Sequence, residues 1–236
     1  MSLRLGFDVD GVLADFRTAF AALAERHHLE PDDSDPSGAA SRDLRRLWDR
    51  VGRIENWWLS LAAYEPGEIG RLYTLSRQHR WEVFFLTCRP ASAGESVLVQ
   101  TQWWLERHGF YLPAVVTVPG SRGELANALR LDLVVDDQFA NCADVISAST
   151  TKALLMLRGG GGERLRDQAT SRGVGVVATL AEAIAVVERL QAILPERRGR
   201  LRRLVDWFGT TAAEAQVPLD PRPYRAGTAG GAGGEP

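Results

Sequence analysis

Six short apolar runs, separated by segments of helical periodicity, constrain the fold more than any other feature of this sequence. Short apolar runs bounded by turn residues predict β-strands, and strands that alternate with helices predict a parallel sheet covered on both faces. We therefore predict an α/β fold, a doubly wound parallel sheet with right-handed crossovers. The predicted strands are residues 3–7, 82–87, 115–118, 133–137, 153–157 and 174–177.

The first of these runs ends in two acidic residues. Residues 3–7 supply the apolar side chains, Asp8 and Asp10 follow, and Gly11 permits a sharp turn. Because side chains alternate along a strand, both carboxylates start on the same side of the sheet. Ligands of open α/β sheets bind at the carboxyl ends of the strands. Two carboxylates this close repel each other unless a cation or a shared proton compensates, so the pattern favours a site over an ordinary turn.

Two later strands also end in polar residues. Thr87 ends the second strand, and Asp136 and Asp137 end the fourth. Ser121 begins a capping-box pattern, which places Arg122 in the first turn of the helix between the third and fourth strands. Each signal is weak by itself, but together they predict one polar site at the carboxyl edge of the sheet.

This order of features resembles the haloacid dehalogenase (HAD) superfamily of phosphohydrolases, whose motifs run Asp-x-Asp, then Thr or Ser, then a basic residue, then an acidic pair. The resemblance covers about residues 3–190. Residues 8–13 and the Thr-x-Arg-Pro of residues 87–90 resemble more narrowly its 5'(3')-deoxyribonucleotidase-like members. It implies a Rossmann-like core and Mg²⁺-dependent hydrolysis of a phosphomonoester, with a nucleoside monophosphate as the expected substrate.

The resemblance also implies roles for individual residues. Asp8 would attack phosphorus and form an aspartyl phosphate. Asp10 would protonate the leaving oxygen and then deprotonate the attacking water. Thr87 would hydrogen-bond a phosphate oxygen. Mg²⁺ would bind Asp8, the backbone carbonyl of Asp10 and Asp136, with Asp137 as a further ligand or a neighbour of the ligands.

The third motif departs from the family pattern, which usually has a lysine there. Lys152 is the only lysine of the chain, and it follows the acidic strand. Arg122 is the best substitute and Arg130 the next, and a helix N-terminus itself favours an anion. Arginine is planar and forked, so it does not simply replace lysine. Arg122 could instead be only a surface residue. Because the usual lysine is missing, the chain could also be a metal- or phosphate-binding regulatory module with weak catalysis.

The segment between the first two strands has a helical pattern. We expect residues 15–65 to form a small helical cap on a core of residues 1–14 and 66–194, with Ser41 starting its second helix. Phe16, Trp57 and Trp58 could stack a base beneath this cap, although such aromatic residues more often form a core. Arg89 could contact the substrate phosphate or pair with a carboxylate.

Two further capping-box patterns predict helices in the core. Ser92 and Glu95 predict one that ends near Gly109, and Thr179 predicts another that runs to about Leu194. Beyond it, we expect an arginine-rich helix at residues 195–208, more typical of a solvated face than of a binding surface, and a disordered tail at residues 209–236.

Composition narrows the function classes. The 236 residues are 45% hydrophobic and 25% charged, with a net charge of −2, which gives no electrostatic reason to expect a nucleic acid polymer or a membrane as partner. Two cysteines do not make a disulfide framework, and neither a spanning segment nor a signal peptide is visible. We expect a cytoplasmic enzyme that acts on a small phosphoester. A sugar phosphate is the alternative to a nucleotide, and the oligomeric state stays open.

Overall fold

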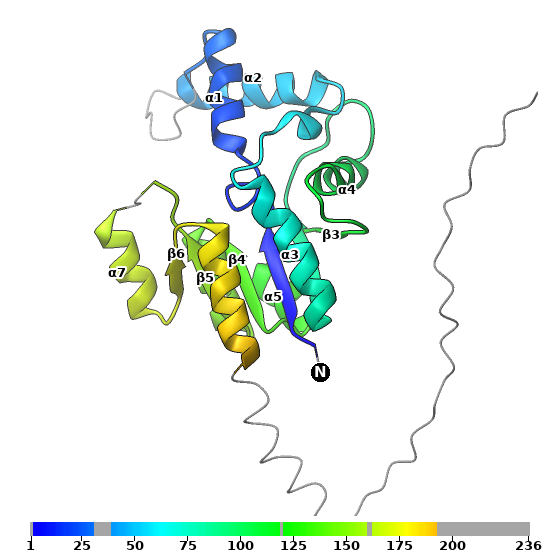
Figure 1. Ribbon diagram of the computed structural model, residues 1–236. Coiled ribbons are helices and arrows are strands. Elements are labelled where there is room, and N and C mark those ends of the chain that lie inside the picture. The colour runs from blue at the N-terminus through cyan, green and yellow to red at the C-terminus, as the bar shows by residue number, and fades with distance from the viewer. Residues whose placement is uncertain (1, 31–38, 119, 160–161, 193–236) are drawn as a thin grey trace, which may run out of the picture. The chain divides into compact units, whose positions relative to one another are not determined.

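The computed structural model describes residues 2–30, 39–118, 120–159 and 162–192, which belong to one compact unit. A six-stranded sheet has the order β3-β2-β1-β4-β5-β6, and every neighbouring pair is parallel (Figure 1). The predicted doubly wound sheet is thus confirmed, with every strand within one residue of its expected bounds. The strands are β1 (Arg4–Asp8), β2 (Glu82–Thr87), β3 (Ala114–Thr117), β4 (Leu133–Asp136), β5 (Lys152–Met156) and β6 (Gly175–Val177).

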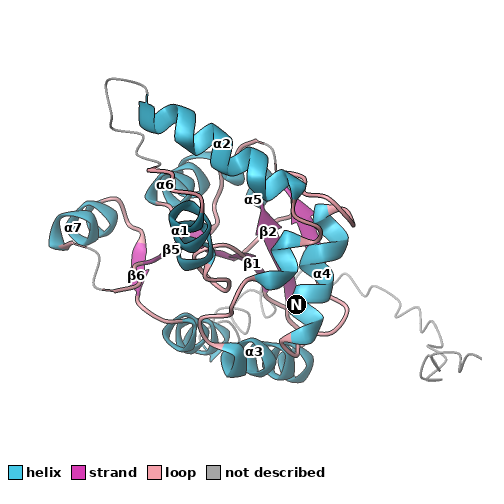
Figure 2. Ribbon diagram, turned by 90° about the horizontal axis from the view of Figure 1, so that it is seen from above, coloured by secondary structure: helices cyan, strands magenta, loops and turns pink. Residues whose placement is uncertain are grey.

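Helices cover both faces of the sheet. Figure 2 shows α3 and the helix of residues 180–192 along one side of the sheet, and α5 and α6 along the other. On the first side, the Arg71 guanidinium lies 3.0 Å from the Glu188 carboxylate and joins the two helices. The helices of the core are α3 (Pro66–His79), α4 (Val97–Arg107), α5 (Arg122–Ala128), α6 (Phe139–Ala148), α7 (Glu163–Ser171) and the helix of residues 180–192.

The two central strands are buried because both of their faces are covered. All four residues of β4 are buried, and so are four of the five residues of β1. This explains why the sequence shows continuous apolar runs rather than strict alternation. Aliphatic side chains fill the layer between the sheet and the helices α5, α6 and α7, among them Ala126, Val134, Val145, Leu155 and Ala169.

An insert of α1 (Phe16–Arg26), α2 (Ala39–Arg53) and the 3₁₀ helix η1 (Trp57–Ser60) lies between β1 and α3, beyond the carboxyl end of β1 (Figure 1). Asp15 caps α1, because its Oδ1 accepts a hydrogen bond from the Thr18 N–H at 3.0 Å. The two connections to the insert are tied together: the Asp15 N–H donates to the Ala62 carbonyl, and the Tyr64 N–H to the Leu13 carbonyl. We call residues 15–65 the cap.

Two predicted helix starts are wrong. The helix expected to start at Ser41 begins at Ala39, so Ser41 lies inside it. Ser96, not Ser92, caps α4, and its hydroxyl accepts a hydrogen bond from the Val99 N–H. The cause is tertiary: Gly94 has φ +90°, and Asn56 of the cap packs so closely that a Cβ there would lie 2.4 Å from its Oδ1. Backbone held in this conformation cannot belong to a helix.

Other expectations have mixed outcomes. The hydroxyls of Ser121 and Thr179 accept the hydrogen bonds expected at the starts of their helices, from Glu124 and Glu182 respectively. In residues 54–64, whose pattern is helical, the only helix is η1, and Ala63 forms an isolated β-bridge with Ala14. The basic helix and the tail expected from residue 195 onward lie outside the described residues. Among the helices in the described ranges, none combines the length and the apolar character needed to cross a membrane.

Candidate active site

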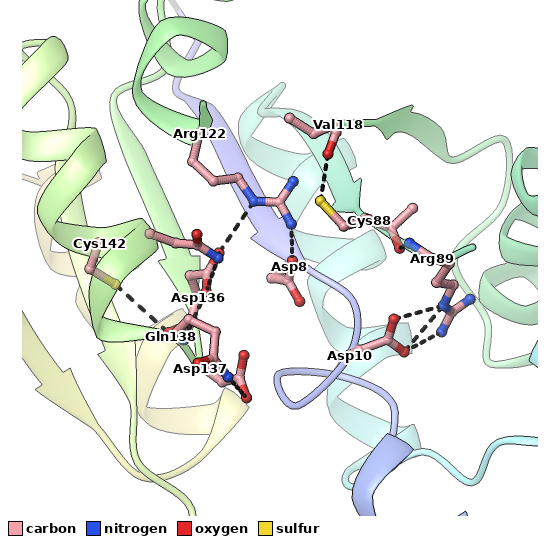
Figure 3. Close-up of polar contacts among 12 residues, drawn as sticks. Asp8, Asp10, Cys88, Arg89, Val118, Arg122, Asp136, Asp137, Gln138 and Cys142 are labelled. Carbon is pink, nitrogen blue, oxygen red and sulfur yellow. Dashed lines mark hydrogen bonds and ion pairs between the residues drawn. The ribbon is translucent and has the colours of Figure 1, made fainter. Parts of the chain in front are cut away.

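The strand order brings the predicted residues together. β1 lies between β2 and β4, so the carboxyl ends that carry Asp8, Thr87 and Asp136 are adjacent at one edge of the sheet. Figure 3 shows Asp8 between Arg122 and the loop that carries Asp10, with Asp136 and Asp137 on the neighbouring strand end. Thr87 is buried, and its hydroxyl accepts a hydrogen bond from the Arg89 N–H at 3.3 Å.

Gly11 lets the loop after β1 pack against the acidic pair. Its φ is +84°, and a Cβ at this position would lie 2.2 Å from Oδ2 of Asp137. Both the backbone conformation and the close approach therefore require glycine. The exposed Arg17 guanidinium also lies near Asp137, 3.7 Å from its carboxylate.

Arg122 is a buried residue of the site, not a surface residue. It is 4% exposed; its Nη2 donates to Asp8 Oδ1 at 2.5 Å, and its Nε lies 3.5 Å from Asp136 Oδ2. The start of α5 is fixed by Asp144, whose Oδ2 accepts hydrogen bonds from the Ser121 hydroxyl and the Gly123 N–H. These two donors at the start of α5 are thus bound by Asp144 and not by a ligand. What α5 contributes to the site is the Arg122 guanidinium.

The guanidinium has donor capacity to spare. Nε and Nη1 of Arg122 are buried, and neither has a hydrogen-bond partner among the described residues. Buried donors are rarely left without an acceptor, because their desolvation costs about 1–3 kcal/mol. Nε already faces Asp136 at 3.5 Å, so Nη1 is the donor suited to an anionic ligand in the cavity that Arg122 lines.

The acidic residues at this edge are short of positive charge. Burial and the nearby Asp136 carboxylate raise the pKa of Asp8 well above its ordinary value, and Arg122 offsets this only in part. Burial raises the pKa of Asp136 as well, against the hydrogen bonds that stabilise its charged form. Burial and Asp136 raise the pKa of Asp137 to about 6. A cation added near these groups would stabilise their ionised forms.

The site fits a hard divalent cation in charge and ligand chemistry. Within the described ranges, no three His, Cys, Asp or Glu side chains are grouped so that they alone could hold a metal ion. Mg²⁺ does not need such a group, because it commonly binds one or two carboxylates and keeps several waters. Asp8 and Asp136 supply two buried carboxylates that share one guanidinium, so a second positive charge here would be compensated.

Asp10 points away from these acids and toward Arg89 (Figure 3). Arg89 Nε donates to both carboxylate oxygens of Asp10, at 3.1 and 2.9 Å, and Nη2 donates to Oδ1 at 2.7 Å. Of the two roles open to Arg89 from its sequence, the structure therefore shows the pairing with a carboxylate.

A cavity of about 300 Å³ lies between the acidic edge of the sheet and the cap. Phe16 and Trp58 line it, as does Trp48 of α2, whose ring stacks on Phe16 with centroids 5.7 Å apart and planes inclined by 14°. Trp57 does not line the cavity; it is buried and packs edge-on against Trp58. Trp48 is a further cavity residue that the sequence analysis did not single out.

Asn141 and Gln138 are further site residues that the sequence analysis missed. The Asn141 side-chain amide donates to both oxygens of Asp136 at 3.1 Å, and the Gln138 N–H donates to Asp136 Oδ1 at 2.8 Å. These bonds fix the orientation of the Asp136 carboxylate. Asn141 lies in the first turn of α6, five residues after Asp136, and this spacing is the only signal that could have revealed it.

No protein-family model matches the chain, and neither does any curated protein sequence. Solved structures of haloacid dehalogenase-like hydrolases do match it in fold. One from Deinococcus radiodurans R1, with bound phosphate and sodium, is 14% identical, with a TM-score of 0.53 over 80% of this chain and 96% of that chain. One from Streptococcus pneumoniae is 12% identical, with a TM-score of 0.51 over 79% of this chain and 98% of that chain.

A candidate β-phosphoglucomutase from Thermotoga maritima is similar to the same degree: it is 14% identical, with a TM-score of 0.51 over 79% of this chain and 99% of that chain. At these identities the similarity is one of fold. The chain thus has the HAD-like α/β fold, as its motifs led us to expect.

Proposed function

We propose that this protein is a HAD-type phosphomonoester hydrolase that acts through an aspartyl-phosphate intermediate. The observation that carries the proposal is the pairing of Asp8, at the end of β1, with a buried arginine that lines the cavity and whose Nη1 has no hydrogen-bond partner in the part of the chain that the structure describes. Phosphoryl transfer spreads negative charge over the phosphate oxygens, so catalysis depends on positive charge and in-line positioning.

In this proposal, Asp8 is the nucleophile. Its carboxylate oxygen attacks phosphorus, the bond to the leaving oxygen breaks, and the enzyme carries an acyl phosphate. The Arg122 guanidinium lies against Asp8 and would bind oxygens of the transferred group. The buried Thr87 hydroxyl, at the end of the neighbouring strand, is the proposed further donor to the phosphate.

Asp10 is the proposed proton carrier. It gives a proton to the leaving oxygen in the first step and takes one from the attacking water in the second, as the bond between Asp8 and phosphorus breaks. One carboxyl group cannot attack phosphorus and carry this proton at the same time, which is why the pair is needed.

Asp8, Asp136 and the backbone carbonyl of Asp10 are the groups that would hold Mg²⁺, with Asp137 beside them. The ion would supply positive charge that neutralises the phosphate and the surrounding acids. Asn141 and Gln138 would keep Asp136 oriented for this task.

A nucleoside monophosphate is the proposed substrate. The phosphate would lie at Asp8 and Arg122, and the aromatic side chains of Phe16, Trp48 and Trp58 line the same cavity on the cap side. Aromatic faces stack on nucleobases, and each stacked base contributes about 1–3 kcal/mol.

The experiment is a phosphate-release assay on nucleoside monophosphates, sugar phosphates and an aryl phosphate, with excess Mg²⁺ and with EDTA. We expect Mg²⁺-dependent release with nucleotides preferred, and loss of release in Asp8→Asn. The matched control is Asp132→Asn, which changes an exposed aspartate before the start of β4, at the opposite end of the strand from the site. If the wild-type protein releases no more phosphate from any ester than Asp8→Asn does, the proposed function is wrong.

A further inference from the structure

We propose that Arg89 is a positioning residue that fixes the carboxylate of Asp10 at the wall of the cavity, and that it does not bind the substrate phosphate. The inference rests on the proposed function, because it assigns Asp10 the proton transfer described above. It goes further in assigning a role to an arginine for which the sequence left both phosphate contact and carboxylate pairing open.

Every nitrogen of the Arg89 guanidinium already has an acceptor. Nε and Nη2 hold the two oxygens of Asp10, and Nη1 donates to the Thr101 hydroxyl at 3.0 Å. The Thr101 hydroxyl in turn donates to the Val97 carbonyl at 2.7 Å. Every nitrogen of Arg89 thus already has an acceptor within the protein, whereas Arg122 has buried nitrogens with no hydrogen-bond partner among the described residues.

The surroundings of Arg89 hold it rigidly. Its side chain is 0% exposed, and its guanidinium lies over the ring of Trp58 with 4.8 Å between Cζ and the ring centroid. Trp58 is itself tied to the adjoining loop, because its Nε1 donates to the Pro90 carbonyl at 3.0 Å. Contacts from η1, α4 and the loop after β2 thus fix the guanidinium, which makes it a poor candidate for swinging onto a ligand.

Asp10 needs such a partner because it lies on a loop, two residues beyond the end of β1. Its side chain is 23% exposed and lines the cavity, so it stays accessible to a substrate while Arg89 holds its carboxylate by hydrogen bonds. Proton transfer requires the carboxyl oxygen within hydrogen-bond reach of the leaving oxygen. A displacement of about 1 Å in such a group can cost 10²-fold in rate.

The chemistry provides a test that separates positioning from phosphate binding. When the bond from phosphorus to an alkyl oxygen breaks, the leaving alkoxide needs a proton from Asp10. The 4-nitrophenolate anion is stable and leaves without one. kcat/KM reports the steps up to the breaking of the ester bond. A misplaced Asp10 should therefore lower kcat/KM for alkyl phosphoesters and spare kcat/KM for 4-nitrophenyl phosphate, whereas a lost phosphate ligand lowers both.

The experiment compares kcat/KM of wild type, Arg89→Met and Arg89→Lys, in excess Mg²⁺, on 4-nitrophenyl phosphate and on the alkyl phosphoester that the wild type hydrolyses fastest. For Arg89→Met we expect kcat/KM to fall by about 10²-fold on the alkyl ester and by less than about threefold on the aryl ester. Arg89→Lys keeps the positive charge but lacks the forked guanidinium, so its loss of kcat/KM on the alkyl ester should lie between those of wild type and Arg89→Met. Equal losses on both esters, or a raised KM with unchanged kcat, would overturn the inference.

Two further measurements control for damage to the fold. Arg71→Met removes another arginine that pairs with carboxylates, those of Glu68 and Glu188, each at 3.0 Å, and it should not discriminate between the esters. Asp10→Asn with Arg89→Met leaves no unpaired charge, and the double variant should be no slower on the alkyl ester than Asp10→Asn alone. A further loss in the double variant would contradict positioning through Asp10. A wild-type protein inactive on all esters would instead overturn the proposed function, before any variants are compared.

Discussion

Replacement of Arg122 by methionine should destabilise the folded protein because it removes the guanidinium shared by two buried carboxylates. Asp8 is 7% exposed and Asp136 is 0% exposed, and Arg122 contacts both. Methionine fills much of the same volume without a charge. The variant therefore keeps the packing of α5 and leaves two like charges facing each other in a poorly solvated place.

The magnitude follows from the loss of one partner of a buried ion pair, which costs about 3–5 kcal/mol. For a domain of this size, 1 kcal/mol corresponds to about 2–4 °C, so the melting temperature should fall by about 6–20 °C.

The loss of stability in Arg122→Met, relative to wild type, should depend on pH. Burial and Asp136 already raise the pKa of Asp8, and the loss of Arg122 raises it further. The folded variant then binds protons more readily than the unfolded chain, so its deficit shrinks as the pH falls from 7 toward 4.

The assay is urea denaturation and thermal melting of wild type and Arg122→Met at pH 7 and pH 5, with and without Mg²⁺. Added Mg²⁺ should stabilise the variant more than the wild type, because the acids of the variant lack their counterion. Arg17→Met is the control: this arginine is 75% exposed and 3.7 Å from Asp137, and its loss should change stability by less than about 0.5 kcal/mol. An Arg122→Met protein within about 1 kcal/mol of wild type, with the same response to Mg²⁺ and pH, would refute the reasoning.

Two other predictions concern the cap. Glu65 accepts hydrogen bonds from the Leu180 and Ala181 N–H groups and from Arg158; although partial burial opposes them, these bonds hold the pKa of Glu65 below its ordinary value of 4.5. Its stabilising effect is present above pH 4.5 and is lost as the pH falls through its lowered pKa, so the stability gap between wild type and Glu65→Gln should narrow on acidification in denaturation curves. Trp48→Ala should raise KM for a nucleoside monophosphate by about 5- to 150-fold, with KM for glycerol phosphate unchanged in the same assay; equal effects on both would exclude base stacking.

The sheet and the acidic edge could be predicted because their signals are local. An apolar run that ends in Asp8 or Asp136 indicates both the strand and its end, and the alternation of strands with helices indicates a parallel sheet. Arg122 could be placed for the same reason, since Ser121 marks the start of a short helix. The helix start predicted at Ser92 is wrong because a capping box is a local pattern, whereas the packing of Asn56 against Gly94 joins residues that are distant in the sequence.

The partners within the site could not be predicted, because they depend on contacts distant in sequence. Arg89 and Asp10 are 79 positions apart, and no local pattern decides whether that arginine pairs with an acid or with a ligand. Trp48 has the periodicity of any buried helix residue. Its place at the cavity comes from the packing of its ring against Phe16 of α1, which depends on how the two cap helices meet.

In the proposed function, an arginine takes the place of the lysine usual in HAD phosphohydrolases, and it changes the shape of the positive charge more than its amount. A lysine is a compact point charge, whereas the guanidinium fork reaches Asp8 through Nη2 and approaches Asp136 through Nε. One residue can thus serve both strand ends and still present Nη1, which has no partner among the described residues. Phosphoryl transfer needs positive charge at this place and does not require that an ammonium group supply it. The missing lysine is therefore no argument against turnover, provided that the two carboxylates and the phosphate can share the guanidinium.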